Sequence, residues 1–270
     1  MRVIEQQKNA VFKSLTELAD AHCHLDIIHD AGLIRKAIER GVISMVTNGV
    51  DIKSNMKALE LADNKNIFAA LGMDPEHIVG VPEHELDRIV EFNLDLARQN
   101  RNRIIGIGEI GLDYKNEEWR QMASRQKLVF VRFIKLAAEL DLPISVHARS
   151  ALKDVFQVLE EEHAEKVHLH YFEGDEKDAE LAVKRGYMIS VPPIESSKRR
   201  RMIASTPIEN LMAESDAPVV GNSPMAVEQS VRLVAEAKSI DFEGAAAALT
   251  NNTKGFFGFG RMQHGGLIRI

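Results

Sequence analysis

One short segment combines side chains that bind metals with a spacing that brings them together. The segment from Asp20 to Leu25 reads DAHCHL and directly follows a short apolar run. Alternate residues of an extended strand point to the same face, so Asp20, His22 and His24 should share one face. Imidazole and carboxylate groups gathered in this way form part of a metal site. Cys23 alternates to the other face, and we expect it to be a small buried hydrophobe.

Later apolar segments end in residues of the same kind, and this recurrence carries the interpretation. The residues at their ends are Glu109, His147, His170 and Asp216. With the two histidines of the first segment they offer nitrogen and oxygen ligands for two divalent ions about 4 Å apart. Glu109 is the natural bridge between an ion held by the first two histidines and an ion held by the later two.

Asp216 has two expected roles. It would bind the first ion and, as a carboxylate within hydrogen-bond reach, take the proton from the attacking water. A pair of ions lowers the pKa of bound water to about 7 and clamps the oxygens of the reacting group. The expected reaction is therefore metal-assisted hydrolysis, with Asp216 and Glu109 as its catalytic carboxylates.

The elements that must position these residues follow one another in a regular order. Apolar, β-branched runs alternate with amphipathic runs of helical period. Strands are expected at 18–21, 42–47, 67–71, 104–107, 144–146, 167–169, 187–191 and 211–213. Helices are expected at 33–39, 56–62, 86–98, 125–140, 152–162, 178–185 and 197–204. This α/β order predicts a (β/α)8 TIM barrel, whose active site lies at the C-terminal ends of its strands.

A doubly wound parallel sheet is the alternative fold. It is disfavoured because no Gly-x-Gly-x-x-Gly follows the first expected strand. Ligands spread over five strands also suit a closed barrel better. We expect a single barrel domain over residues 18–261, preceded by an arm or short helix at 1–17 and followed by a polar tail at 262–270.

Composition narrows the class of protein. The 270 residues are 45% hydrophobic, which suffices for one large core. No run of 18 apolar residues and no signal peptide is evident, so we expect a cytoplasmic protein without a membrane partner. A lone cysteine agrees with a reducing compartment. The net charge of -6 argues against a basic nucleic-acid coat, although a local patch could still hold a phosphate backbone.

Two basic features could contact an anionic substrate. Arg149 lies two residues after His147 and could orient an anion through its planar fork. The segment Lys198–Arg201 reads KRRR and is the sharpest basic cluster of the chain. A charge run on a helix is usually a solvated face, so Arg149 is the better candidate.

Several segments resemble, in order, the signatures of the TatD family. They are DAHCHL at 20–25, GEIGLDY at 108–114, VHAR at 146–149, HYFEG at 170–174 and ESDAP at 214–218. Residues 252–253 and 256–258 resemble its closing helix. The resemblance implies a metal-dependent hydrolase on a TIM barrel of the amidohydrolase-like group. It also implies ligand roles for His22, His24, Glu109, His147, His170 and Asp216.

The family's activities set the expected substrates. TatD proteins are best known as magnesium-requiring deoxyribonucleases that trim single-stranded DNA from the 3′ end, and some remove D-amino acids from tRNA.

Three segments of this chain depart from the family pattern. The usual Gly-x-His-Pro is replaced by GMDP at 72–75, the loop at 219–224 is short, and residues 192–197 replace a small Ser/Gly turn. Asp74 thus stands where an imidazole would meet the substrate, and would repel a phosphodiester unless protonated or metal-bound.

The main hypothesis is a divalent-metal phosphodiesterase, a deoxyribonuclease that trims single-stranded DNA without reading its sequence. It would use two divalent ions, with magnesium, manganese and zinc as the candidates. The alternative is a hydrolase of a carbonyl substrate, such as a lactone, an amide or an aminoacyl ester, including aminoacyl-tRNA. Asp74 favours this alternative. A barrel that binds metal or a partner without catalysis is disfavoured, because all the ligand positions hold competent residues.

Overall fold

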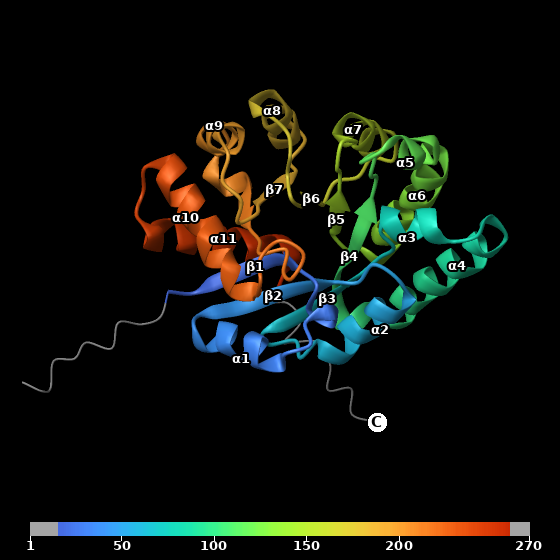
Figure 1. The fold of residues 1–270 in the computed structure, drawn as a ribbon, viewed down its shortest axis with the longest axis horizontal. Coiled ribbons are helices and arrows are strands. Elements are labelled where there is room, and N and C mark those ends of the chain that lie inside the picture. The colour runs from blue at the N-terminus through green and yellow to red at the C-terminus, as the bar shows by residue number, and fades with distance from the viewer. Residues whose placement is uncertain (1–15, 260–270) are drawn as a thin grey trace, which may run out of the picture.

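Eight parallel strands form a nearly closed barrel surrounded by helices (Figure 1). The computed structural model describes residues 16–259, so most of the expected arm and all of the expected tail lie outside the described residues. The strands are β1 (Leu18–Cys23), β2 (Val42–Asn48), β3 (Ile67–Leu71), β4 (Ile104–Gly111), β5 (Ile144–His147), β6 (Val167–Leu169), β7 (Met188–Val191) and β8 (Leu211–Ala213). Each strand pairs with the next along the chain, which confirms the predicted barrel.

The helices lie between successive strands and ring the barrel (Figure 1). They are α1 (Ala31–Glu39), α2 (Ile52–Leu61), α3 (Pro75–Gly80), α4 (Glu83–Gln99), α5 (Glu117–Gln121), α6 (Ala123–Leu140), α7 (Leu152–Glu161), α8 (Glu176–Lys184), α9 (Ser197–Ser205), α10 (Val227–Lys238) and α11 (Phe242–Phe257). Short 3-10 turns occur at η1 (Leu25–Ile27), η2 (Arg101–Arg103), η3 (Ile208–Asn210) and η4 (Pro224–Ala226). All the predicted helices are present. Helices α3, α5 and α10 were not predicted, and of α11 only its end was expected.

The barrel closes beyond the end of β8 rather than along it. The backbone N–H of Asp216 donates to the carbonyl of His22 at 3.0 Å, and the N–H of His24 donates to the carbonyl of Ala217 at 2.7 Å. Ser215 adds a backbone bond to the side chain of Asp20 at 2.8 Å. These bonds tie the segment after β8 to β1, and they bring Asp216 beside the two histidines of the first strand.

Two glycines permit the close backbone approach that the site needs. Gly111 ends β4 with φ at +142°, and a Cβ there would lie 2.1 Å from the carbonyl oxygen of His147. At Gly72, just after β3, a Cβ would lie 2.3 Å from the carbonyl oxygen of Glu109. A side chain at either position would push the neighbouring strand away. These glycines therefore help to set where Glu109 and His147 lie.

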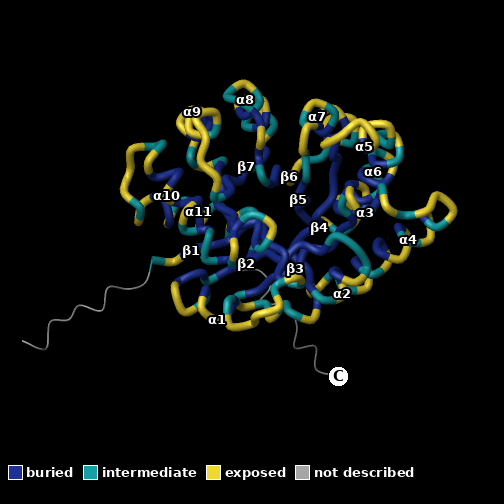
Figure 2. Tube along the Cα trace, viewed as in Figure 1, coloured by how far each residue is buried: buried dark blue, intermediate teal, exposed yellow. Residues whose placement is uncertain are grey.

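Apolar packing joins the strands to the helices, and aromatic rings close one end of the barrel. The strands are buried, whereas the outer faces of the helices are exposed (Figure 2). At the end of α11 the rings of Phe257 and Phe259 stack, and the ring of Phe259 stacks on Phe68 of β3 at 4.3 Å between centroids. Within residues 16–259, no helix combines the length and apolar character needed to cross a bilayer.

Candidate metal centre

The six residues expected to bind metal come together at the C-terminal ends of five strands. His22 lies on β1 with His24 just after it, Glu109 on β4, His147 at the end of β5, His170 just after β6, and Asp216 three residues after β8. All are buried except His147, whose side chain is 21% exposed. Their potential ligand atoms form three overlapping sets of three, and the atoms of each set lie within 4.8 Å of one another. Around the two oxygens of Glu109 these atoms make two groups.

The first group surrounds one carboxylate oxygen of Glu109. Its Oε2 lies 3.2 Å from His22 Nε2 and 3.3 Å from His24 Nε2. Asp216 Oδ1 lies 3.4 Å from His24 Nε2, and this buried oxygen accepts no hydrogen bond of acceptable geometry from the described residues. Two imidazole nitrogens and two carboxylate oxygens thus face one another without hydrogen bonds that satisfy them all. This donor set fits a divalent cation.

The second group surrounds the other oxygen of the same carboxylate. Glu109 Oε1 lies 2.7 Å from His147 Nδ1 and 2.9 Å from His170 Nε2. The His170 ring also stacks on His22, with 3.8 Å between centroids and 7° between planes. Glu109 therefore divides its two oxygens between the two groups, as a bridging ligand would.

The electrostatics of the cluster call for positive charge. Burial alone would raise the pKa of Glu109, but His170, His147 and His22 together hold it well below its usual value. Burial would lower the pKa of His147, yet its bonds to Asp113 and Glu109 raise that pKa to about 10. The carboxylates thus draw positive charge into a buried space, which is the role of a bound divalent ion.

Hydrogen bonds on the outer side of two histidines fix which ring nitrogen is free. His24 Nδ1 lies 3.0 Å from the carbonyl oxygen of Asn48, which can only accept, so this nitrogen carries the hydrogen. His147 Nε2 lies 2.9 Å from Asp113 Oδ2, so its Nδ1 faces Glu109 with a lone pair when the ring is neutral. Both rings are thereby oriented as metal ligands.

Asp113 has a role that the sequence analysis did not assign. Besides contacting His147, its Oδ2 accepts a hydrogen bond from Arg149 Nε at 2.8 Å and forms an ion pair with Arg149 Nη2 at 2.6 Å. The fork of Arg149, expected to hold the substrate, is therefore partly engaged in fixing Asp113. The sequence did contain a signal for this role of Asp113, because Asp113 follows Glu109 by four residues within the same family segment.

We expect Asp113→Asn to weaken divalent-ion binding at His147 and His170 by about 10- to 100-fold. The amide removes the charge that makes His147 a stronger donor and that holds Arg149. Calorimetric titration of the metal-stripped variant would measure the loss. The same change at Asp154, which pairs with Lys127 and Tyr114 away from the site, is the control and should leave binding unchanged. Native affinity in Asp113→Asn would contradict the role given to this carboxylate.

A cavity of about 1000 Å³ leads to the cluster, and both predicted substrate-binding residues line it. Arg149 and Asp74 stand on its walls, and the exposed aliphatic side chains of Ile27, Met56 and Val219 belong to its lining. The short loop at 219–224 thus contributes Val219 to the cavity. None of the described residues that line it is Phe, Tyr or Trp.

Asp74 pairs with a histidine, His77, that the sequence analysis did not single out. Asp74 is the N-cap of α3. Its Oδ1 accepts a hydrogen bond from the backbone N–H of His77 at 2.8 Å and lies 2.6 Å from His77 Nδ1. The bond to Asp74 raises the pKa of His77, a cavity residue. An imidazole therefore stands three residues after the expected position, and the charge of Asp74 is paired with it.

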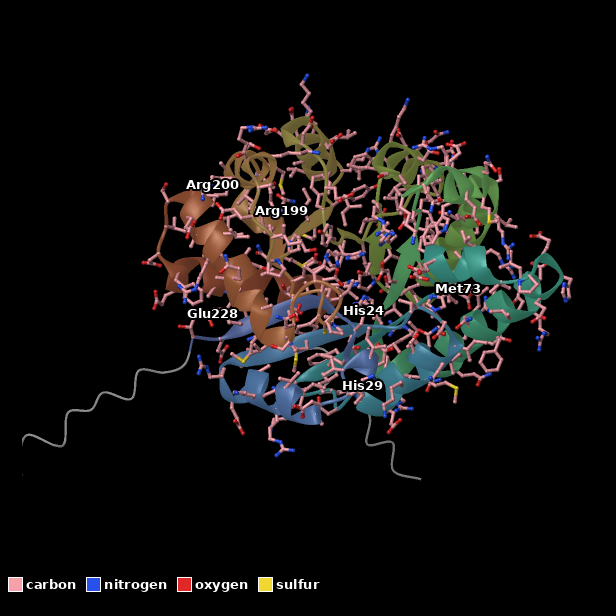
Figure 3. The ribbon with its side chains drawn as sticks, in the orientation of Figure 1. His24, His29, Met73, Arg199, Arg200 and Glu228 are labelled. Carbon is pink, nitrogen blue, oxygen red and sulfur yellow. The ribbon has the colours of Figure 1, made fainter. Side chains whose placement is uncertain are left out.

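The basic cluster Lys198–Arg201 lies apart from this cavity. Arg200 pairs with Glu195 at 2.6 Å, and Arg201 pairs with Glu176 at 2.8 Å. Figure 3 shows Arg199 and Arg200 on α9, well separated from His24. None of these four residues is part of the cavity lining, so their positive charges lie on the surface around α9 and not in the cavity.

Comparisons with known proteins find relatives that match this chain over most of its length. The model of the family described as TatD related DNase matches residues 19–258. Deoxyribonuclease TATDN3 of Homo sapiens is 30% identical over 260 residues, which cover 89% of this chain and 94% of that protein. An uncharacterized metal-dependent hydrolase of Methanocaldococcus jannaschii is 30% identical over 250 residues, covering 88% and 96%. The crystal structure of YJJV, a TatD homolog from Escherichia coli K12, is similar with a TM-score of 0.81 and 27% identity, covering 90% of this chain and 99% of that chain. This chain therefore belongs to the TatD related DNase family and is a metal-dependent hydrolase.

Proposed function

We propose that this protein is a deoxyribonuclease that uses two divalent ions to release nucleotides from an end of single-stranded DNA. The observation that carries the proposal is the division of the Glu109 oxygens between two groups of histidines. The deoxyribonuclease name of the human relative supports a nucleic-acid substrate. The cavity ends at the cluster, and the side chains that lie deeper in the barrel, such as Ser145 and His168, are fully buried, so a strand end fits better than an internal segment.

Each residue of the centre has a defined task. His22, His24 and Asp216 would hold one ion, His147 and His170 the other, and Glu109 both. Bound divalent ions lower the pKa of water and stabilise charge on the reacting phosphoryl group. Asp216 Oδ1 would accept the proton of the attacking water, because Asp216 lines the cavity and no hydrogen bond from the described residues satisfies this oxygen.

Two cations on the cavity walls would orient the DNA backbone. Arg149 keeps 43% of its side chain exposed beside the cluster, and His77 keeps 40%. The described residues that line the cavity include no Phe, Tyr or Trp on which bases would stack. Recognition should therefore rest on the phosphate backbone and be independent of sequence.

The direct test is digestion of single-stranded DNA labelled at either end by metal-stripped protein, with magnesium, manganese or zinc restored in separate reactions. The proposal predicts metal-dependent release of mononucleotides from one end of the strand. Metal binding without release of nucleotides in any of the three reactions would refute it.

We expect the KM for DNA to rise with pH because of His77. Its raised pKa means that the imidazolium is fully present below 6.5 and is lost as the pH rises through the higher value. The carboxylates of Asp51, Asp74 and Glu76 act on this ring and favour the charged form. Loss of one charged contact to phosphate should raise KM about tenfold.

His77→Gln tests this expectation, measured as KM across the pH range. The variant should show the high KM at every pH. His84→Gln removes an imidazole that is 80% exposed on α4, and it should keep the native pH dependence. A native pH profile in His77→Gln would contradict a contact between His77 and the substrate.

A carbonyl substrate is the second candidate, and the charge of the cavity walls favours it. Apart from the candidate ligands and the Asp113–Arg149 pair, five carboxylates line the cavity, against two lysines; they belong to Asp26, Asp51, Glu60, Asp74 and Glu76, and the lysines are Lys53 and Lys57. Such a wall suits a neutral or amine-bearing ester better than a polyanion. Parallel assays with an aminoacyl ester, a lactone and the DNA oligomer would separate the two. Turnover of the ester or lactone alone would select the carbonyl substrate.

A further inference from the structure

A chain of buried hydrogen bonds runs from the candidate metal centre across the inside of the barrel. His22 Nδ1 lies 3.1 Å from Ser145 Oγ on β5, which lies 3.2 Å from His168 Nδ1 on β6. His168 Nε2 lies 2.8 Å from Ser190 Oγ on β7, and Ser190 donates to Glu214 Oε2 just after β8. All five residues are fully buried.

When the Glu214 carboxyl group is ionised, the chain can run in only one direction. Ser190 has a single hydroxyl hydrogen, which it gives to Glu214, so its oxygen accepts from His168 Nε2. A fully buried imidazole with only hydroxyl partners is neutral, because burial disfavours charge. His168 therefore has one N–H, its Nδ1 accepts from the hydroxyl of Ser145, and Ser145 in turn accepts from His22 Nδ1.

We propose that this chain sets the tautomer of His22, so that Ser145, His168 and Ser190 are positioning residues for the metal centre. The hydrogen is held on Nδ1, and the lone pair of His22 Nε2 faces Glu109 Oε2 at 3.2 Å. The other tautomer would direct an N–H at the place of a cation. This inference rests on the metal centre of the proposed function.

The arrangement differs from that of the other oriented histidines. His24 and His147 each contact the acceptor that fixes them, the carbonyl of Asn48 and the carboxylate of Asp113. His22 has no carboxylate or carbonyl at Nδ1 among the described residues, and Glu214 acts on it only through three relays. Glu214 is itself fixed, since its Oε1 accepts the backbone N–H of Tyr171 at 2.7 Å.

The test compares Ser145→Ala, Ser190→Ala and the double variant. The nitrogen chemical shifts of His22 in metal-free, ¹⁵N-labelled protein report its tautomer without any turnover. Titration with manganese then gives the affinity of the first ion. Ser190→Ala touches no ligand, yet it should reduce the Nδ1–H population of His22 and weaken the first ion about 10-fold or more. The double variant should be no worse than Ser145→Ala, because both changes break one chain.

Ser230→Ala is the matched control. Ser230 is equally buried and its hydroxyl donates to the backbone carbonyl of Glu214 at 2.7 Å, outside the chain. It should keep the native tautomer and affinity. A native His22 tautomer in Ser190→Ala, or additive losses in the double variant, would overturn the proposal. If native protein binds no manganese while the tautomer still responds to Ser190→Ala, the chain is supported and the proposed function fails.

Discussion

Glu109→Gln is expected to lower metal-dependent turnover more than about 100-fold, since residues that merely orient ligands contribute 10- to 100-fold. The amide keeps the shape of the side chain but removes the charge shared by four histidines. Because both oxygens of Glu109 are engaged, binding of both ions should weaken together. Metal content after equilibrium dialysis and the rate of nucleotide release would measure the two effects.

Glu139→Gln is the control for that change. Glu139 is exposed on α6, pairs with Arg98 and is not part of the cavity lining. It should keep native metal content and rate. If Glu109→Gln lost one ion but kept the other at native affinity, this result would contradict a bridging carboxylate.

Asp216→Asn should reduce kcat by about 100- to 10,000-fold, the range that general-base catalysis contributes. The amide can still occupy the position beside His24, but it cannot take a proton. KM should change little, because the cavity walls that hold the substrate are untouched. Steady-state kinetics with DNA measure both constants.

The matched change is Asp87→Asn, at a carboxylate that is 87% exposed and paired with Arg132. Native kinetics are expected there. An Asp216→Asn variant that retains bound metal and native kcat would remove Asp216 from the proposed reaction.

The strands could be predicted closely from the sequence because each is a short β-branched run between turn residues. The expected ranges match the eight observed strands to within a few residues, and β4 extends further, through Glu109 to Gly111. Several helices were harder to find. Helix α3 is too short to show a helical period, and α11 contains a run of alanines that gives no one-sided pattern.

The gathering of the six candidate ligands could be predicted because they follow apolar runs, and the ends of parallel strands meet at one mouth. The partners of these residues depend on contacts that no local pattern encodes. Asp113 reaches His147 from the loop after β4, and Ser145, His168 and Ser190 align only through the register of three neighbouring strands. His77 was missed because its pairing with Asp74 depends on the N-terminal turn of α3.

The most direct measurement is a titration of metal-stripped protein in which bound divalent ions and nucleotide release from single-stranded DNA are followed in the same samples. A bridged pair of ions predicts that release begins with metal, reaches its maximum at two ions per chain, and is at least about 100-fold slower in Asp216→Asn. Full activity with one ion or none would contradict the bridged pair, and two bound ions without any release would contradict the nuclease.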